Sequence, residues 1–222
     1  MDWQALWLSL RLGALTVLVL LPVAVFLGRW LAVTRVRGRP LIEAALALPL
    51  VLPPTVIGFY LLVTFSPRSW FGDLWRQVFG DTLVFSFEGL LIASVLINVP
   101  FAVQPAQRAF EAIATDLREA AASCGMSWWR ALFRIELPLA WPGILTGMVL
   151  TFAHTLGEFG VVLMVGGSIP GETRTIAIAI YDRVQAFDDV AAGRMAAVLL
   201  LISLVTIAAT FVLSQRMGNR RA

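Results

Sequence analysis

The sequence contains no lysine, one cysteine and one histidine, and only 14% of its 222 residues are charged. A single cysteine, Cys124, excludes an intrachain disulfide, and a single histidine, His154, excludes a histidine-rich metal site within the chain. Because the Gly-x-x-x-x-Gly-Lys phosphate loop requires a lysine, the chain cannot bind ATP through such a loop. The sequence also lacks a Gly-x-Ser-x-Gly motif and paired acids within its apolar stretches, so we do not expect an enzyme.

Apolar residues take the place of the missing charges. They make up 59% of the chain, whereas soluble domains average about 45–50% apolar and about 25% charged residues. Five apolar stretches, at about 7–28, 41–65, 85–105, 142–165 and 192–214, are each long enough to cross about 30 Å of hydrocarbon as a helix. The sequence therefore predicts an all-α integral membrane protein with about five transmembrane helices in a single domain, residues 1–222.

All 17 basic residues are arginines, and their distribution predicts the orientation of the chain. One set of loops holds eleven of them: Arg29, Arg35, Arg37, Arg39, Arg108, Arg118, Arg130, Arg134, Arg216, Arg220 and Arg221. The other set holds five, and Arg11 lies inside the first apolar stretch. Because the arginine-rich side is normally cytoplasmic, we expect a periplasmic N-terminus and a cytoplasmic C-terminus. The arginines are spread over separate loops, which argues against a nucleic-acid partner.

The longest loop on the arginine-rich side, about residues 106–141, predicts two short helices. Asp116, with Glu119 three residues later, is placed to cap the first helix. Gly125 suits the left-handed position that ends it, and Ser127 is placed to cap the second helix. We expect Pro138 to stop the second helix before the next span.

Seven positions of this loop form a pattern of Glu-Ala-Ala, Gly and Ile-x-Leu-Pro at fixed spacing: Glu119, Ala120, Ala121, Gly125, Ile135, Leu137 and Pro138. The pattern resembles the cytoplasmic coupling loop of ABC importer permeases. The resemblance implies that the loop seats in a groove of a separate ATPase subunit and transmits its closure to the membrane helices. The alternative is an ordinary pair of interfacial helices with a capping Glu.

Two further clusters lie inside apolar stretches and are candidates for a translocation pathway or gate. Pro53, Pro54 and Thr55 follow in a proline-rich run, and helices broken by proline tend to line cavities near the midplane. The alternative there is a kink without ligand contact. Thr155, Gly157 and Glu158 form the second cluster, and an ionisable group inside a span is a functional candidate. We favour a structural or gating role for Glu158, as an acceptor of hydrogen bonds from neighbouring groups, with His154 as either its partner or a packing residue.

Three segments together, Leu48–Gly58, Leu156–Gly160 and Ile169–Ile176, resemble the molybdate permeases within the oxyanion group of these importers. The resemblance implies a type I ABC importer permease fold and a translocation pathway for molybdate across the bacterial inner membrane. It also implies a homodimer, two ATP-binding subunits that carry ATP and Mg²⁺, and a periplasmic oxyanion-binding protein, with no cofactor in this chain. His154 departs from the family, which often has Arg there.

Alternatives to this reading remain open at the level of sequence. The same machine could carry tungstate or sulfate, since these are also tetrahedral dianions. A secondary transporter would instead show an inverted repeat and charged relays within the spans, and neither is visible in the sequence.

Overall fold

The computed structural model describes the backbone of residues 1–219 and the side chains of residues 1–208, and this part of the chain is helical without strands. The elements are α1 (Trp3–Val33), α2 (Arg39–Val51), α3 (Pro54–Phe65), α4 (Trp70–Phe79), α5 (Phe87–Glu111), α6 (Thr115–Ser123), α7 (Trp128–Ala131), the π-helical segment η1 (Leu132–Glu136), α8 (Leu137–Gly157), α9 (Gly160–Gly166), α10 (Ile176–Gln185) and α11 (Asp189–Asn219). Among the described residues, four helices are long and apolar enough to cross a membrane, or five if the bent pair of α2 and α3 is one span. The predicted all-α membrane fold with about five spans is confirmed.

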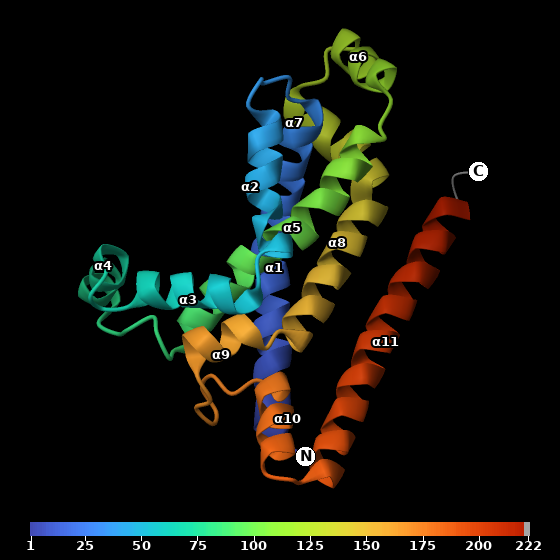
Figure 1. The fold of residues 1–222 in the computed structure, drawn as a ribbon. Coiled ribbons are helices and arrows are strands. Elements are labelled where there is room, and N and C mark those ends of the chain that lie inside the picture. The colour runs from blue at the N-terminus through green and yellow to red at the C-terminus, as the bar shows by residue number, and fades with distance from the viewer. Residues whose placement is uncertain (220–222) are drawn as a thin grey trace.

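Helices α1, α5 and α8 form the central bundle (Figure 1). Their core near one end contains the buried residues Leu20, Phe110, Leu132 and Ile144. Glycines let the backbones approach closely, as small residues commonly do between membrane helices. A Cβ on Gly147 of α8, for example, would lie 2.9 Å from the carbonyl oxygen of Ala102 on α5.

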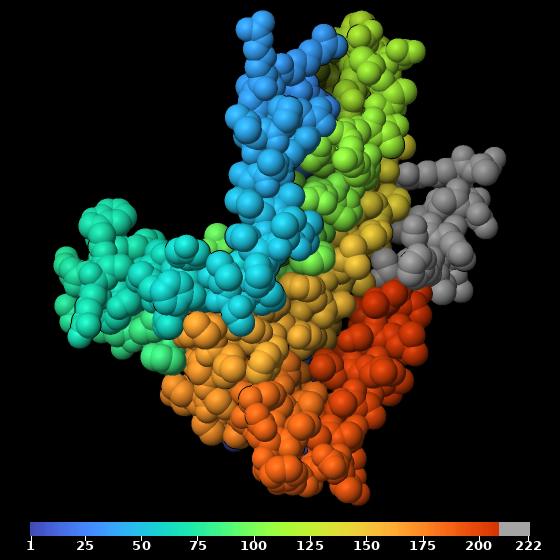
Figure 2. All heavy atoms as spheres, in the orientation of Figure 1, coloured from blue at the N-terminus to red at the C-terminus, as the bar shows by residue number. Residues whose placement is uncertain are grey.

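The second expected span, 41–65, is not one straight helix. The chain bends by 106° between α2 and α3, with the break at Leu52 and Pro53. Pro53 and Pro54 cannot donate backbone hydrogen bonds, so α2 cannot continue through them. As a result α3 and the amphipathic helix α4, which the sequence analysis missed, form an arm that projects sideways from the bundle (Figures 1 and 2).

The fourth expected span, 142–165, is also different in the structure. Helix α8 ends at Gly157, Glu158 has an extended backbone with ψ 128°, and a separate helix α9 begins at Gly160. At its other end the span begins earlier, because α7, η1 and α8 run on as one helical stretch from Trp128 to Gly157.

Pro138 therefore does not stop the helix, and this expectation was wrong. The π-helical turn of η1 precedes it, in which the N–H of Leu137 donates to the carbonyl of Leu132 five residues back. A proline inside an α-helix lacks an N–H and its ring clashes with the carbonyl of the fourth residue before it. We attribute the continuity of the helix to η1, since the wider turn relieves this clash.

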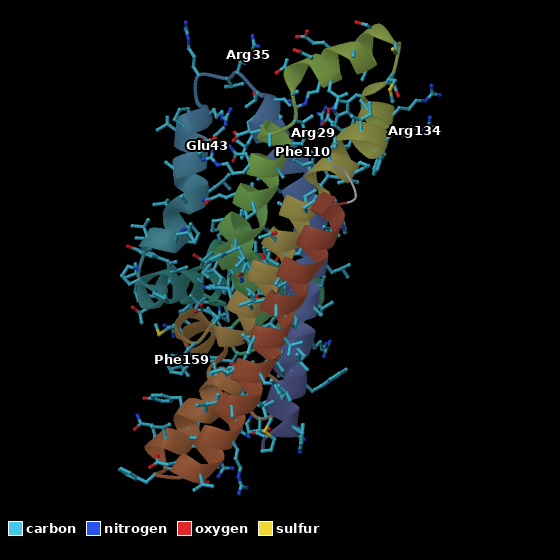
Figure 3. All side chains as sticks on the ribbon, turned by 90° about the vertical axis from the view of Figure 1, so that its right-hand side faces the viewer. Arg29, Arg35, Glu43, Phe110, Arg134 and Phe159 are labelled. Carbon is cyan, nitrogen blue, oxygen red and sulfur yellow. The ribbon has the colours of Figure 1, made fainter. Side chains whose placement is uncertain are left out.

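The two ends of the bundle differ in their chemistry. Helices α6 and α7 lie at one end, whereas the N-terminus and α10 lie at the other (Figure 1). The side chains of Arg29, Arg35 and Arg134 lie at the end that carries α6 (Figure 3). Helix α10 is short, with ten residues, and α11 contains the fifth apolar stretch. Arg220, Arg221 and the C-terminus lie outside the described residues.

Candidate functional site

Helix α6, the first helix of the predicted coupling loop, projects from the end of the bundle (Figure 1). It ends as expected, because Gly125 has a φ of 71° and its N–H donates to the carbonyl of Ala122. The N–H of Met126 reaches the carbonyl of Ala121, which completes a Schellman motif. The expected cap at Asp116 is wrong, since the N-cap residue is Ala114 and receives no side-chain hydrogen bond. Asp116 lies in the first turn instead, where its charge suits the helix dipole.

The seven pattern residues of the loop divide between two places. Glu119, Ala120 and Gly125 are exposed on or beside α6, whereas Ala121 packs inward and is 6% exposed. The other three lie on the continuous helix: Ile135 and Leu137 are half-buried, and Pro138 is exposed. The first place offers small side chains on a free surface, and the second lies at the base of the membrane helix α8.

Helix α7 and the start of η1, between these two places, present exposed aromatic side chains. Ser127 caps α7, since its hydroxyl accepts the N–H of Arg130 at 3.4 Å. Trp128, Trp129 and Phe133 remain 44–55% exposed although their rings contact one another. Together with α6 they form a surface that suits a protein partner or the membrane interface.

A buried carboxylate, Glu136 in η1, is a feature that the sequence analysis missed. Glu136 is 2% exposed, and both of its oxygens accept hydrogen bonds from Arg29 of α1, one of them at 2.9 Å. The guanidinium of Arg118 on α6 lies beside it, with 3.7 Å between Nε and Oε1. In the sequence, Glu136 is the one acid between Glu119 and Glu158. A single acid just before an apolar stretch was therefore the signal that could have marked it as a candidate.

A second polar cluster ties α2 to α5 at the same end of the bundle. Arg39 bonds to Glu43 at 2.7 Å and also to Glu111, and Gln107 donates to both carboxylates. A pocket of about 220 Å³ opens between the two helices beside Glu43, Gln107 and Arg108. This cluster fixes the end of α2 that lies far from its break.

The two broken helices meet where they break. A Cβ on Gly160, at the start of α9, would lie 2.9 Å from Cβ of Pro54, at the start of α3. Gly58 of α3 packs as closely against Met164 of α9. Pro53, Pro54 and Thr55 are exposed at this junction.

The predicted residues on the other side of the junction form a hydrogen-bonded group. Glu158 is 7% exposed, and its carboxylate accepts the N–H of Val161 in the first turn of α9 at 3.0 Å. His154 lies 3.7 Å from the second oxygen of Glu158, and its Nδ1 lies 3.1 Å from Oδ1 of Asn98. Glu158 therefore supplies a partner for a backbone group that the helix break leaves over.

Thr155 and Gly157 complete the predicted pathway residues. Thr155 is buried, and its hydroxyl donates to the carbonyl of Thr151 and lies 3.2 Å from Nδ2 of Asn98. Gly157 is exposed, with open space around it. In this conformation the structure brings Pro53, Pro54, Thr55 and Glu158 to one junction, whereas the hydroxyl of Thr155 faces the contact between α5 and α8.

The opposite end of the bundle holds the loop between α9 and α10. Arg174 of this loop pairs with Asp2 at 2.9 Å, and the N–H of Ile176 donates to Ser9 at 2.8 Å. A pocket of about 630 Å³ beside the loop is lined by Arg11 together with three acids, Asp81, Glu88 and Glu172. Because acids outnumber the arginine, this pocket is a poor site for an anion.

The sequence of this chain is similar to those of known membrane transport proteins. Residues 21–219 match the family described as "Binding-protein-dependent transport system inner membrane component". The chain is 47% identical over 95% of its length, and 93% of the relative's, to the "Molybdenum transport system permease protein ModB" of Azotobacter vinelandii. It is 41% identical, over 83% of its length and 80% of the relative's, to the protein of that name from Escherichia coli K12.

Two further likenesses concern the substrate group and the fold. The "Sulfate transport system permease protein CysT" of Escherichia coli K12 is 32% identical, over 84% of this chain and 67% of its own. A solved bacterial alginate ABC transporter, in complex with a periplasmic protein, has a chain that superposes with a TM-score of 0.77 at 21% identity, covering 96% of this chain and 78% of that one. At that identity the likeness establishes the fold alone.

The hydrogen bond from Val161 to Glu158 makes a prediction about stability. Glu158→Leu removes the acceptor and leaves the N–H of Val161 without its partner, which costs about 1–3 kcal/mol. Glu158→Gln keeps an acceptor of the same shape and should cost less. In thermal unfolding of the purified protein in detergent, the unaltered chain should therefore have the highest midpoint temperature, Glu158→Gln an intermediate one and Glu158→Leu the lowest. Glu172→Leu, on an exposed acid, is the control and should shift the midpoint little; equal shifts in all three variants would contradict the capping role.

Proposed function

Because the chain belongs to the family of binding-protein-dependent transport system inner membrane components, we propose that it is the permease subunit of an ATP-binding-cassette importer that carries molybdate across the inner membrane. The observation that carries the proposal is the projecting helix α6, which ends in a Schellman motif at Gly125 and presents Glu119 and Ala120 on a free surface. A partner that binds this surface and moves can therefore move the membrane bundle through α6.

The proposed partners follow from what the chain itself lacks and exposes. Without a lysine it has no Gly-x-x-x-x-Gly-Lys loop, so ATP and Mg²⁺ belong to two separate ATP-binding subunits that dock at α6 and α7. A second copy of the chain completes the path, and exposed apolar residues on α2 and α3, among them Val51, Phe59 and Tyr60, support such a contact. A periplasmic oxyanion-binding protein delivers the substrate at the end that holds the N-terminus and α10.

The path through the bundle should hold its substrate weakly. The junction of the broken helices offers the exposed Thr55, but its acidic group, Glu158, has the wrong sign for a dianion. Moving a dianion into a low-dielectric path costs free energy unless opposite charges meet it. We infer that affinity resides in the binding protein, and that Pro53, Pro54, Thr55, Thr155, Gly157 and Glu158 shape or gate the path.

The relatives favour molybdate over sulfate, because the two molybdenum permeases described above are 47% and 41% identical to this chain and the sulfate permease is 32% identical. Tungstate is the closer competitor in chemical terms, since it matches molybdate in charge and shape.

Uptake by the reconstituted importer tests the proposed substrate. Proteoliposomes that contain this chain, its ATP-binding subunits and its binding protein should accumulate labelled molybdate only when ATP is present. Unlabelled tungstate should compete with molybdate at equal concentration, whereas sulfate should not. Accumulation without ATP would contradict the importer, and effective competition by sulfate would contradict the choice of substrate.

The proposed orientation puts α6 in the cytoplasm and the N-terminus in the periplasm, because the side chains of Arg29, Arg35 and Arg134 lie at the α6 end. A reporter that is active only in the periplasm should therefore be active when it is fused before Met1 and inactive when it is fused after Ala222. The reverse pattern would overturn the orientation.

The left-handed backbone at Gly125 makes a prediction about coupling. Gly125→Val places a β-branched residue at a φ of 71°, which costs about 1–2 kcal/mol and favours unwinding the end of α6. We expect uptake to fall strongly while the membrane helices still insert. Gly80→Val is the matched control, because Gly80 has a φ of 84° with open space around it but lies at the end of α4. Equal loss of uptake per assembled complex in both variants would assign the effect to general backbone strain.

A further inference from the structure

A buried ion cluster, formed by Glu136, Arg29 and Arg118, joins the projecting helix α6 to the membrane bundle. We propose that Glu136 is the positioning residue through which a movement of α6 is transmitted to α1 and α8. This inference rests on the proposed function, because it assigns the mechanical link between the surface that meets the ATP-binding subunits and the helices that form the path.

Helix α6 has few other attachments to the bundle. Ala121 is its one buried residue, and its methyl group is too small to hold the helix in place by packing. Arg118 reaches further, since its guanidinium donates to the carbonyl of Phe110 near the end of α5 and to that of Ile113 in the loop that follows. The side chains of Arg29 and Phe110 lie at the end of the bundle that carries α6 (Figure 3).

Glu136 connects this arginine to two membrane helices at once. It lies in η1, which runs without a break into α8, so the position of its carboxylate is fixed to the base of that span. Its two oxygens accept a paired hydrogen bond from Arg29 in the last turns of α1, an arrangement that fixes direction as well as distance. Arg29 also lies over the ring of Trp128, 4.9 Å from its centre, which adds α7 to the same cluster.

Burial strengthens the attraction between the charges of the cluster. The side chains of Glu136, Arg29 and Arg118 are 3%, 12% and 21% exposed, so water screens their charges little. A carboxylate that is separated from its arginines in such a place leaves uncompensated buried charges. Helices α1, α6 and α8 therefore move together more easily than they move apart at this point.

The contact with Arg118 is incomplete in this conformation. Its Nε is buried without a hydrogen-bond partner among the described residues, and it lies 3.7 Å from Oε1 of Glu136. A hydrogen bond between them needs a distance of about 3 Å, so a shift of α6 by somewhat less than 1 Å would complete it. The attraction between Arg118 and Glu136 is therefore stronger when α6 lies closer to η1 than in the present position. A switching element requires such a difference in interaction free energy between two positions of the helix.

The test measures coupling rather than amount. The full complex, with its ATP-binding subunits and binding protein, is reconstituted with Glu136→Gln, which keeps the shape of the side chain and removes its charge. We expect the complex to assemble and hydrolyse ATP, while the molybdate transported per ATP hydrolysed falls at least about fivefold, the lower end of ordinary coupling between sites. Asp73→Asn is the control, because it removes an acid that pairs with an exposed arginine, Arg76, on the distant arm.

Two further variants keep the test decisive. If Glu136→Gln does not assemble, Arg118→Gln carries the test, because Arg118 is the more exposed member of the cluster. Where all variants assemble, the double variant should lose little more coupling than either single one, since both changes break the same link. An unchanged ratio of transport to hydrolysis in whichever variant assembles would overturn the role of Glu136, as would a lower amount of complex with a normal ratio.

The same measurement separates this inference from the proposed function. If the unaltered complex drives no uptake of molybdate, tungstate or sulfate, the importer function falls and the role of Glu136 falls with it. If the unaltered complex transports and the Glu136→Gln complex keeps the same ratio, only the role of Glu136 is overturned.

Discussion

A polypeptide in hydrocarbon must satisfy its backbone hydrogen bonds within itself, and this constraint decides where the chain can bend. Two membrane helices are broken here, after Leu52 and after Gly157, and the breaks lie against each other, as the close approach of Gly160 to Pro54 shows. At one break, proline removes donors that would otherwise be left over. At the other, Glu158 accepts the N–H of Val161. Irregular backbone is thus tolerated where proline removes a donor or a side chain accepts one, and the same place is where we propose that a path opens.

Sequence patterns predicted the parts of the fold that depend on local chemistry. Apolar length gave the spans, and Gly125 and Ser127 gave the ends of the loop helices, because each acts within a few residues. The bend of 106° at the proline run was beyond the sequence, since it depends on α3 packing against α9. The prediction that Pro138 ends the helix was wrong because of local backbone geometry. The π-helical turn just before Pro138 relieves the clash that a proline normally causes in a helix.

Long-range pairing explains what was missed at the candidate site. The role that we infer for Glu136 depends on its ion pair with Arg29, which lies 107 residues earlier in the chain. A local sequence pattern cannot predict that these two residues are in contact. In the sequence that arginine indicates only the side of the membrane, as does Arg118. The structure gives both a second role, because the rule that collects arginines on one side of a membrane also supplies partners for a buried acid at that side.

The placement of buried charge distinguishes the two parts of the molecule. A charge that is buried and paired resists being pulled from its partner, which suits a link that must transmit force. A strong charge in the path would instead hold a dianion and slow its release. The cluster of Glu136, Arg29 and Arg118 lies at the α6 end of the bundle, whereas the junction of the broken helices holds Glu158 beside His154 and, among the described residues, no arginine ion pair. The buried three-residue ion cluster therefore lies at the end where we expect the ATP-binding subunits to act, and the proposed path at the junction has no comparable set of paired charges among the described residues to hold a dianion.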